Sequence, residues 1–402
     1  MKIRGGFLIP FRDKGGAPCA RIITLCGFNL DHLCPKIGKR LTRPWARILA
    51  GPWAGQTLAD LGAEVIKVEA AQGDDTRAWG PPFIMKGDEE TASYFHSCNR
   101  GKSSVTIDLR DPDDQDRLRD LIKDVDILIE NFKVGGLAKY GFDYDSLKQV
   151  NPRLLYCSIT GFGQTGPYAH RAGYDYIIQG MSGFMSITGD PDGMPQRAGV
   201  AITDIFTGVY ATTAILAALR MRDTTGQGQH IDMSLFDSAV SVMANQALNY
   251  LSTGTPPVRT GNYHPNLTPY QVFECADGHI IIATGNDAQY RRLCSVLNLD
   301  DMAEDPKYLR NSDRIAYRED MTERLTERTK TFAKDALLSA CEDQGIPAGP
   351  INDMAEVFAD PQVIARGMKV ELDGVSYVRS PFVFSDADLT LNRGAPKLGE
   401  DN

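Results

Sequence analysis

The amino-acid sequence predicts an α/β fold with a largely parallel β-sheet covered by helices on both faces. From Ala50 onward, amphipathic helical runs alternate with short apolar runs, a pattern typical of βαβ units. The chain has 402 residues, of which 42% are hydrophobic and 24% are charged. This length predicts two to three structural units that each bury a core.

The first half of the chain supplies most of the predicted sheet. Helices are expected over residues 53–61, 115–123 and 145–149, and strands over 64–69, 103–109, 125–129 and 154–159. Because strands and helices alternate, the strands are expected to run parallel with helices on both faces. The glycine-containing run 161–168 then predicts a tight loop, since it lacks both the Gly-Lys-Ser/Thr ending and the GxGxxG pattern of phosphate-binding loops.

The second half predicts a change of architecture after a long helix over 205–222. A strand at 230–235 and a helix reaching 251 precede a Gly- and Pro-rich segment, 252–269, that is a boundary or an active-site loop. The Asp277-Gly278 pair predicts a hairpin between strands at 270–274 and 279–284. Further helices are expected at 289–297, 318–328 and 333–344, and residues 345–350 are interpreted as a linker returning to the first domain.

Residues 1–43 form a basic leader, with nine Lys or Arg against two acids. They contain no apolar core followed by a cleavage box, so a secretory signal is not expected. An organelle transit peptide and a disordered or non-native leader both remain open. Pro44 argues against a central strand over 41–47, because proline cannot donate to a strand ladder.

Charge and cysteine content restrict the function. Asp and Glu number 52 against 43 Lys and Arg, which gives a net charge of −9 and argues against a broad nucleic-acid surface. We expect no membrane span, because no apolar run approaches 18 residues. The eight cysteines form no CxxC pair and the six histidines no HExxH spacing, so neither a metal site nor a disulfide framework is expected.

Two aspartates and one tyrosine are candidate catalytic residues. Asp204 ends an apolar run and opens a helix, so it is either an N-cap or a carboxylate that the helix keeps ionised for nucleophilic attack. Tyr174 and Asp175 begin another helix, where capping is again the simpler interpretation. A set of basic residues forms either a solvated face or a site for a phosphorylated cofactor: Arg77, Arg100, Lys102, Arg110, Lys133 and Lys139.

An ordered set of motifs resembles the class III CoA-transferases, the family of formyl-CoA and carnitine CoA-transferases. The resemblance covers about residues 44–400 and rests on 50–52, 60–69, 73–77, 99–103, 130–132, 161–167, 173–175, 224–229 and 345–350. It implies a large Rossmann-like domain with a parallel sheet, a smaller α+β domain and a homodimer of interlocked rings. The implied division is a leader at 1–43, the large domain at 44–225, the small domain at 226–345 and a return to the large domain at 346–402.

The resemblance also implies a mechanism and a ligand, coenzyme A, with no metal. It places the nucleophilic aspartate on Asp204, with Tyr174 and Asp175 near the reacting centre. The aspartate would pass through an acyl anhydride and a CoA thioester. Contacts to coenzyme A fall on six residues: Ile107, Arg110, Asn131, Phe132, Lys139 and Tyr140.

The 161–208 stretch is most similar to the succinyl-CoA:glutarate type, which implies a dicarboxylic acid as acceptor. A 2-methylacyl-CoA racemase is an alternative, although Tyr174 stands where those relatives use a histidine base. A CoA-binding protein without turnover is a third alternative, because the region before Ala50 departs from the family pattern. We expect a cytoplasmic protein, with the mitochondrial matrix as the alternative given the basic leader.

Overall fold

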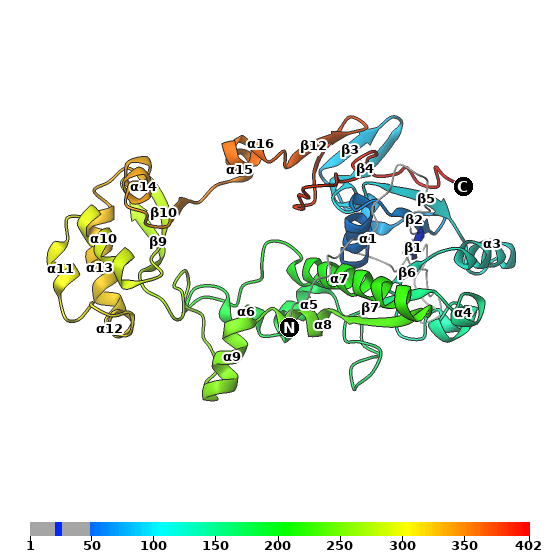
Figure 1. Ribbon diagram of the computed structural model, residues 1–402, viewed down its shortest axis with the longest axis horizontal. Helices are drawn as coiled ribbons and strands as arrows, with labels where there is room; N and C mark the ends of the chain where they lie inside the picture. Colours follow the sequence, from blue (N-terminus) through cyan, green and yellow to red (C-terminus); the bar gives the residue numbers. More distant parts are fainter. Residues whose placement is uncertain (1–20, 26–48) are drawn as a thin grey trace, which may run out of the picture. The chain divides into compact units, whose positions relative to one another are not determined.

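The computed structural model describes residues 21–25 and 49–402, which divide into two compact units (Figure 1). The first unit comprises the described residues up to Phe184, together with Arg197–Ser252 and Ile364–Asn402. The second comprises Met185–Gln196 and Thr253–Val363. The second unit is therefore inserted into the chain of the first.

A six-stranded sheet in which every neighbouring pair is parallel forms the centre of the first unit. Its order is β5-β2-β1-β6-β7-β8, the 3-2-1-4-5-6 order of doubly wound sheets. The strands are β1 (Arg21–Leu25), β2 (Glu64–Glu69), β5 (Lys102–Thr106), β6 (Ile127–Glu130), β7 (Leu155–Thr160) and β8 (Gln229–Ser234). The sequence correctly predicted a largely parallel sheet, with strand ends within a few residues.

Alternation along β6 and β7 explains why both faces of this sheet are covered. Residues 127, 129, 155, 157 and 159 belong to one core with α1 (Ala50–Asp60), α5 (Asp175–Met181), α7 (Ile202–Thr225) and α8 (Leu235–Ser241). Residues 128 and 156 belong to a second core with α3 (Pro112–Lys123) and α4 (Tyr144–Val150). Because successive strand residues point to opposite faces, the two helix layers sandwich the sheet.

Helix α7 is longer and more apolar than the sequence analysis expected. Over its most apolar part the mean hydropathy is 1.5, so by length and composition alone it could cross a membrane. Ala211, Ile215 and Ala218 are nevertheless buried in the first core, where α7 packs along α1. The core helix of a globular unit explains this composition.

Short elements complete the first unit. They are η1 (Asp75–Ala78), β3 (Phe83–Lys86), β4 (Glu89–Ala92), α2 (Ser93–His96), η2 (Ala138–Tyr140), α9 (Ala244–Thr253, whose last residue belongs to the second unit), β12 (Lys369–Leu372) and β13 (Val375–Val378). Two short helices cross the boundary between the units: α6 (Phe184–Ile187) and α16 (Pro361–Ala365). The returning segment is fixed to helices α1 and α2: Ser380 donates to Asp60, and the hydroxyl of Tyr377 bonds His96 Nδ1 at 2.9 Å.

The second unit is an α+β structure around a three-stranded antiparallel sheet of order β11-β10-β9. Its strands are β9 (Tyr270–Cys275), β10 (Gly278–Ala283) and β11 (Ala348–Pro350), and the Asp277-Gly278 turn joins β9 to β10 as predicted. The helices are α10 (Asp287–Val296), α11 (Asp300–Glu304), α12 (Asn311–Ala316), α13 (Arg318–Thr329), α14 (Lys334–Asp343) and α15 (Met354–Ala359).

The predicted boundaries differ from the compact units in four places. Residues 185–196, predicted within the large domain, belong to the second unit. Residues 226–252 belong to the first unit, because β8 pairs with β7 in the parallel sheet. Residues 345–350 are not a simple linker, since β11 pairs with β10, and the chain returns to the first unit at Ile364. Arg21–Leu25, which we assigned to the leader, forms a central strand. The rest of the leader and the Pro44 argument lie outside the described residues.

Candidate active site

Asp204 is the third residue of α7 and not its N-cap, which lies at Ala201. The amide hydrogens at this helix start are taken by another carboxylate. Asp175 Oδ1 accepts from the Thr203 amide at 2.8 Å, from the Thr203 hydroxyl at 2.6 Å and from the Asp204 amide at 3.4 Å. The capping interpretation of Asp204 was therefore wrong, and the structure assigns that task to Asp175.

Two glycines place Asp175 at the end of β7. Gly161 follows β7, and Gly173 stands two residues before α5. A Cβ on Gly161 would lie 2.5 Å from the Gly173 Cα, and the reverse substitution meets the Gly161 Cα at the same distance. Only glycine permits this approach, which brings the start of α5 against the sheet. Tyr174, half-buried, directly precedes α5.

Asp204 is 5% exposed, and burial has the largest effect on its carboxyl group. Burial, followed by the charge of Asp175, raises the pKa of Asp204 to about 8, and a hydrogen bond from the Ala50 amide opposes the shift. The expectation that the helix keeps Asp204 ionised at neutral pH is thus not met, because Asp175 occupies the helix N-terminus. In the free chain Asp204 is mostly protonated at pH 7.

The start of α1 places Asp204 at the carboxyl ends of the strands. A Cβ on Gly51 would contact Ile129 and Ile159, which lie at or near the last residues of β6 and β7. Ala50, the first residue of α1, donates to Asp204. Ligands of doubly wound sheets bind at this edge. The two aspartates therefore occupy the position where such a fold carries its chemistry.

Aromatic side chains next to this pair were not singled out from the sequence. Burial, and then the charge of Asp204, raise the pKa of Tyr94 in α2, and Asp175 adds to the effect. Trp79 packs edge-on against Tyr94, with 5.4 Å between ring centroids, and is 40% exposed. No motif in the sequence marks these residues, because only the fold brings α2 beside the start of α7.

The six residues assigned to coenzyme A lie in two groups at the same sheet edge. Ile107 and Arg110 follow β5, and the other four follow β6, with β2 and β1 between the two strands. The Ile107 side chain is buried in the second core, whereas Arg110 is largely exposed and pairs with Asp108 at 2.8 Å.

The four residues after β6 form one loop. Asn131 and Phe132 are half-buried, Lys139 is exposed, and its Nζ lies 4.6 Å from the centroid of the half-buried Tyr140 ring. The loop thus combines a cation with apolar surface. That these residues contact coenzyme A stays a prediction.

Three of the six basic residues noted in the sequence have structural partners instead. Arg77 donates to Glu69 at 2.8 Å, and Arg100 pairs with Asp60. Lys102 donates to the carbonyls of Pro52 and Cys98, each at 2.8 Å. All three side chains are buried, so neither a solvated face nor a phosphate site describes them.

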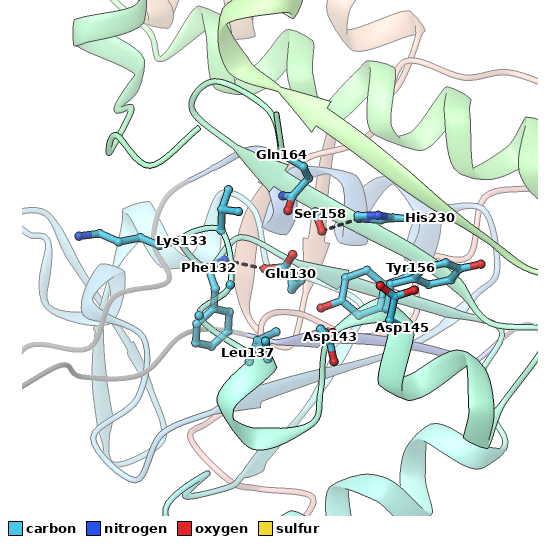
Figure 2. A pocket seen from close by; sticks show the side chains of 15 residues that line it. Glu130, Phe132, Lys133, Leu137, Asp143, Asp145, Tyr156, Ser158, Gln164 and His230 are labelled. Atoms are coloured by element: carbon cyan, nitrogen blue, oxygen red, sulfur yellow. Dashed lines mark hydrogen bonds between the residues drawn. The ribbon is translucent and has the colours of Figure 1, made fainter. Parts of the chain in front are cut away.

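A cavity of about 220 Å³ lies beside the loop that follows β6 (Figure 2). Glu130 lines this cavity. Burial raises the pKa of its carboxyl group to about 7, and its Oε2 accepts from the Phe132 amide at 2.7 Å. Ser158 bonds Glu130 and, at 2.9 Å, His230 Nε2. Of the six residues assigned to coenzyme A, only Phe132 lines this cavity. The cavity itself was not predicted from the sequence.

Within residues 21–25 and 49–402, no group of three or more His, Cys, Asp or Glu side chains is arranged to hold a metal ion.

Fold and site together define an α/β protein that presents two adjoining aspartates at the carboxyl edge of a parallel sheet. A family model described as CoA-transferase family III matches residues 44–402. The chain belongs to this family and is an enzyme that transfers coenzyme A, which confirms the resemblance seen in the motifs.

Two named CoA-transferases and one solved structure are similar to this chain over most of its length. Succinate–glutarate CoA-transferase of Agrobacterium fabrum is 55% identical over 363 residues, which cover 88% of this chain and 91% of that protein. Succinyl-CoA:glutarate CoA-transferase of Homo sapiens is 41% identical over 378 residues, covering 92% and 85%. The crystal structure of a CAIB/BAIF family protein from Brucella suis matches with a TM-score of 0.83 and 54% identity, covering 95% of this chain and 96% of that one.

Proposed function

We propose that this enzyme moves coenzyme A from succinyl-CoA or a similar donor to a dicarboxylic acid such as glutarate, with Asp204 as the nucleophile. The observation that carries the proposal is the Asp204 carboxyl group, which is buried beside Asp175 and the start of α1 at the carboxyl edge of the sheet. The names of the two succinate and glutarate CoA-transferases support the choice of substrates.

The reaction proceeds through four balanced acyl transfers. An ionised Asp204 oxygen attacks the thioester carbonyl, the C–S bond breaks, and the CoA thiolate leaves with the electron pair. The thiolate then attacks the Asp204 acyl carbon of the mixed anhydride, which releases succinate and forms an aspartyl-CoA thioester. The acceptor carboxylate attacks this thioester, the C–S bond breaks, and a second anhydride forms as the CoA thiolate leaves. The thiolate then attacks the acceptor acyl carbon of this anhydride, which gives the acceptor acyl-CoA and restores the Asp204 carboxylate.

Backbone and side-chain groups around Asp204 supply the other roles in these steps: stabilising the leaving group, positioning the nucleophile and binding coenzyme A. The amide of Ala50, which already bonds Asp204, is a donor that stabilises the carboxylate leaving group. Asp175 holds the first turn of α7 by accepting from the Thr203 amide, and Tyr174 directly precedes Asp175 in the chain. The loop of Asn131, Phe132, Lys139 and Tyr140, with Arg110 across the sheet edge, binds the nucleotide end of coenzyme A.

The active form is a homodimer of interlocked chains. Large apolar side chains on α7 and α9 are exposed in the single chain and support this arrangement, among them Phe206, Val209, Tyr210, Leu248 and Leu251. Light scattering should give a particle of about twice 44.1 kDa. A monomer at working concentrations would contradict the dimer.

The enzyme works in the cytoplasm. The cysteines that the structure describes are buried free thiols, which suits a reducing compartment. Cell fractionation tests this assignment, and recovery with mitochondria would favour the matrix instead.

Incubation of the enzyme with succinyl-CoA and a panel of dicarboxylic acids, followed by mass spectrometry of the acyl-CoA products, tests the activity. We expect a new acyl-CoA only when an acceptor is present, and none from Asp204→Asn. Hydroxylamine should convert Asp204 to a hydroxamate in the presence of succinyl-CoA. Absence of any new acyl-CoA, or deuterium exchange at the α-carbon of a 2-methylacyl-CoA without acceptor, would overturn the proposal.

A further inference from the structure

Gln179 is a buried amide in α5 that bridges two parts of the active site. Its side chain is fully buried, with 0% exposed. Nε2 donates to Asp175 Oδ2 at 2.7 Å, and Oε1 accepts from the Ala198 amide at 2.9 Å. Ala198 belongs to the segment that leads into α7, so one side chain joins Asp175 to the approach of the helix that carries Asp204.

The bridge closes a ring of contacts around the start of α7. Asp175 Oδ1 bonds the amide and hydroxyl of Thr203, while Asp175 Oδ2 bonds Gln179. Gln179 in turn fixes Ala198, so the chain between Ala198 and Thr203 is held at both ends by α5. Without these bonds the segment would have room to move, because a Cβ on Gly199 would meet no atom within 4 Å.

We propose that Gln179 is a positioning residue, which acts through Asp175 to hold the first turn of α7 so that the Asp204 carboxyl group faces the acyl group of the substrate. This inference rests on the proposed function of Asp204. An amide suits the task because it offers both a donor, for Asp175, and an acceptor, for Ala198, without adding charge beside two carboxyl groups. Asp175 also contributes, after burial, to the raised pKa of Asp204, so a displacement of Asp175 would act on the nucleophile as well.

The matched control is Gln56, a second buried amide in the same unit. It is 3% exposed, its Nε2 donates to the Ser97 carbonyl at 3.1 Å, and its Oε1 accepts from the Arg100 amide at 3.0 Å. Gln179→Leu and Gln56→Leu therefore remove the same chemical group from equally buried places. Only the first loses a contact with Asp175.

We expect Gln179→Leu to lower kcat by about 10- to 100-fold with little change in KM for the acyl-CoA, because a misplaced nucleophile affects the chemical steps more than binding. Loss of the Gln179 donor frees the Asp175 carboxylate to move relative to Thr203 and Asp204, so its electrostatic effect on Asp204 should change. The acidic limb of kcat/KM should therefore shift from its wild-type position. Gln56→Leu should retain kcat within about 2-fold and an unchanged pH profile, whatever its effect on thermal stability.

Gln179→Glu supplies a rescue test. A neutral glutamic acid offers one O–H donor and one carbonyl acceptor, as the amide does, whereas the ionised form can donate nothing to Asp175. The activity of this variant relative to wild type should fall as the pH rises. Equal losses of kcat in Gln179→Leu and Gln56→Leu, or full activity in a folded Gln179→Leu, would overturn the inference.

The two proposals can fail separately. If the wild-type enzyme transfers no coenzyme A, the proposed function fails, and 13C NMR titration of labelled aspartate carboxyl groups, with Asp204→Asn for assignment, still tests the coupling. A pKa for Asp204 that differs between Gln179→Leu and wild type supports the positioning role. Identical titration curves would contradict it.

Discussion

The Asp204 carboxyl group lies where two helices begin, yet it receives only one described amide, that of Ala50, because Asp175 takes the α7 amides. Burial therefore dominates its ionisation. Since attack needs the ionised form and kcat/KM reports the free enzyme, we expect kcat/KM to rise with pH and to reach half its maximum near pH 8. A stopped assay from pH 6 to 10 measures this, and a flat profile across that range would contradict it.

Asp204→Asn removes this ionisation and should change the pH dependence of stability. The pKa of Asp204 is raised from 3.8 to about 8, so the folded chain retains a proton that the unfolded chain loses between those values. Wild type then loses about 1.4 kcal/mol of unfolding free energy per pH unit within that window, relative to Asn. Urea unfolding at several pH values should show the advantage of Asp204→Asn growing up to about pH 8 and then levelling off.

The loop after β6 is an element whose shape depends on one buried side chain. Glu130→Gln keeps an acceptor for the Phe132 amide and a polar partner for Ser158, so it should bind coenzyme A within about 2-fold of wild type. Glu130→Leu leaves the Phe132 amide without its acceptor and should weaken binding by about 3- to 10-fold. Calorimetric titration with coenzyme A measures both. Equal affinities for the two variants would show that Glu130 does not shape the binding loop.

The contact between the end of β7 and the start of α5 depends on the pair Gly161 and Gly173. Gly161→Ala would place a Cβ 2.5 Å from the Gly173 Cα, so the backbone must shift, and we expect a loss of about 2 to 4 kcal/mol in unfolding free energy together with a lower kcat. Gly349→Ala serves as the control, because no atom lies within 4 Å of its added Cβ. Comparable stability of the two variants in urea would contradict the close-packing argument.

At the scale of the whole molecule, hydrophobic periodicity predicted the positions of helices and strands better than it predicted how they are divided between the two units. Strand β2 and the Asp277-Gly278 hairpin follow from local pattern alone. Arg21–Leu25 could not be placed in the sheet, because it lies in a basic segment and gains its role only by pairing with β2 and β6. The family motifs singled out Asp204 and Asp175, but they did not indicate which of the two aspartates caps α7.

The remaining site residues depend on contacts between segments far apart in sequence. The charge of Asp204 acts on Tyr94, which lies more than a hundred residues away in sequence. Gln179 bonds Ala198 through a side chain that resembles any other helical glutamine. Burial likewise reversed the expected ionisation of Asp204, and burial cannot be derived from the spacing of residues along the chain.

The insertion of one unit into the other has a consequence for biosynthesis. Thr253–Val363 forms nearly all of the second unit and leaves the ribosome as one stretch, whereas the first unit still lacks Ile364–Asn402, including Ser380, which bonds Asp60. We expect the later-translated unit to close before the earlier one is complete. Nascent chains arrested before Ile364 should resist protease within Thr253–Val363 while the parallel sheet is still cleaved.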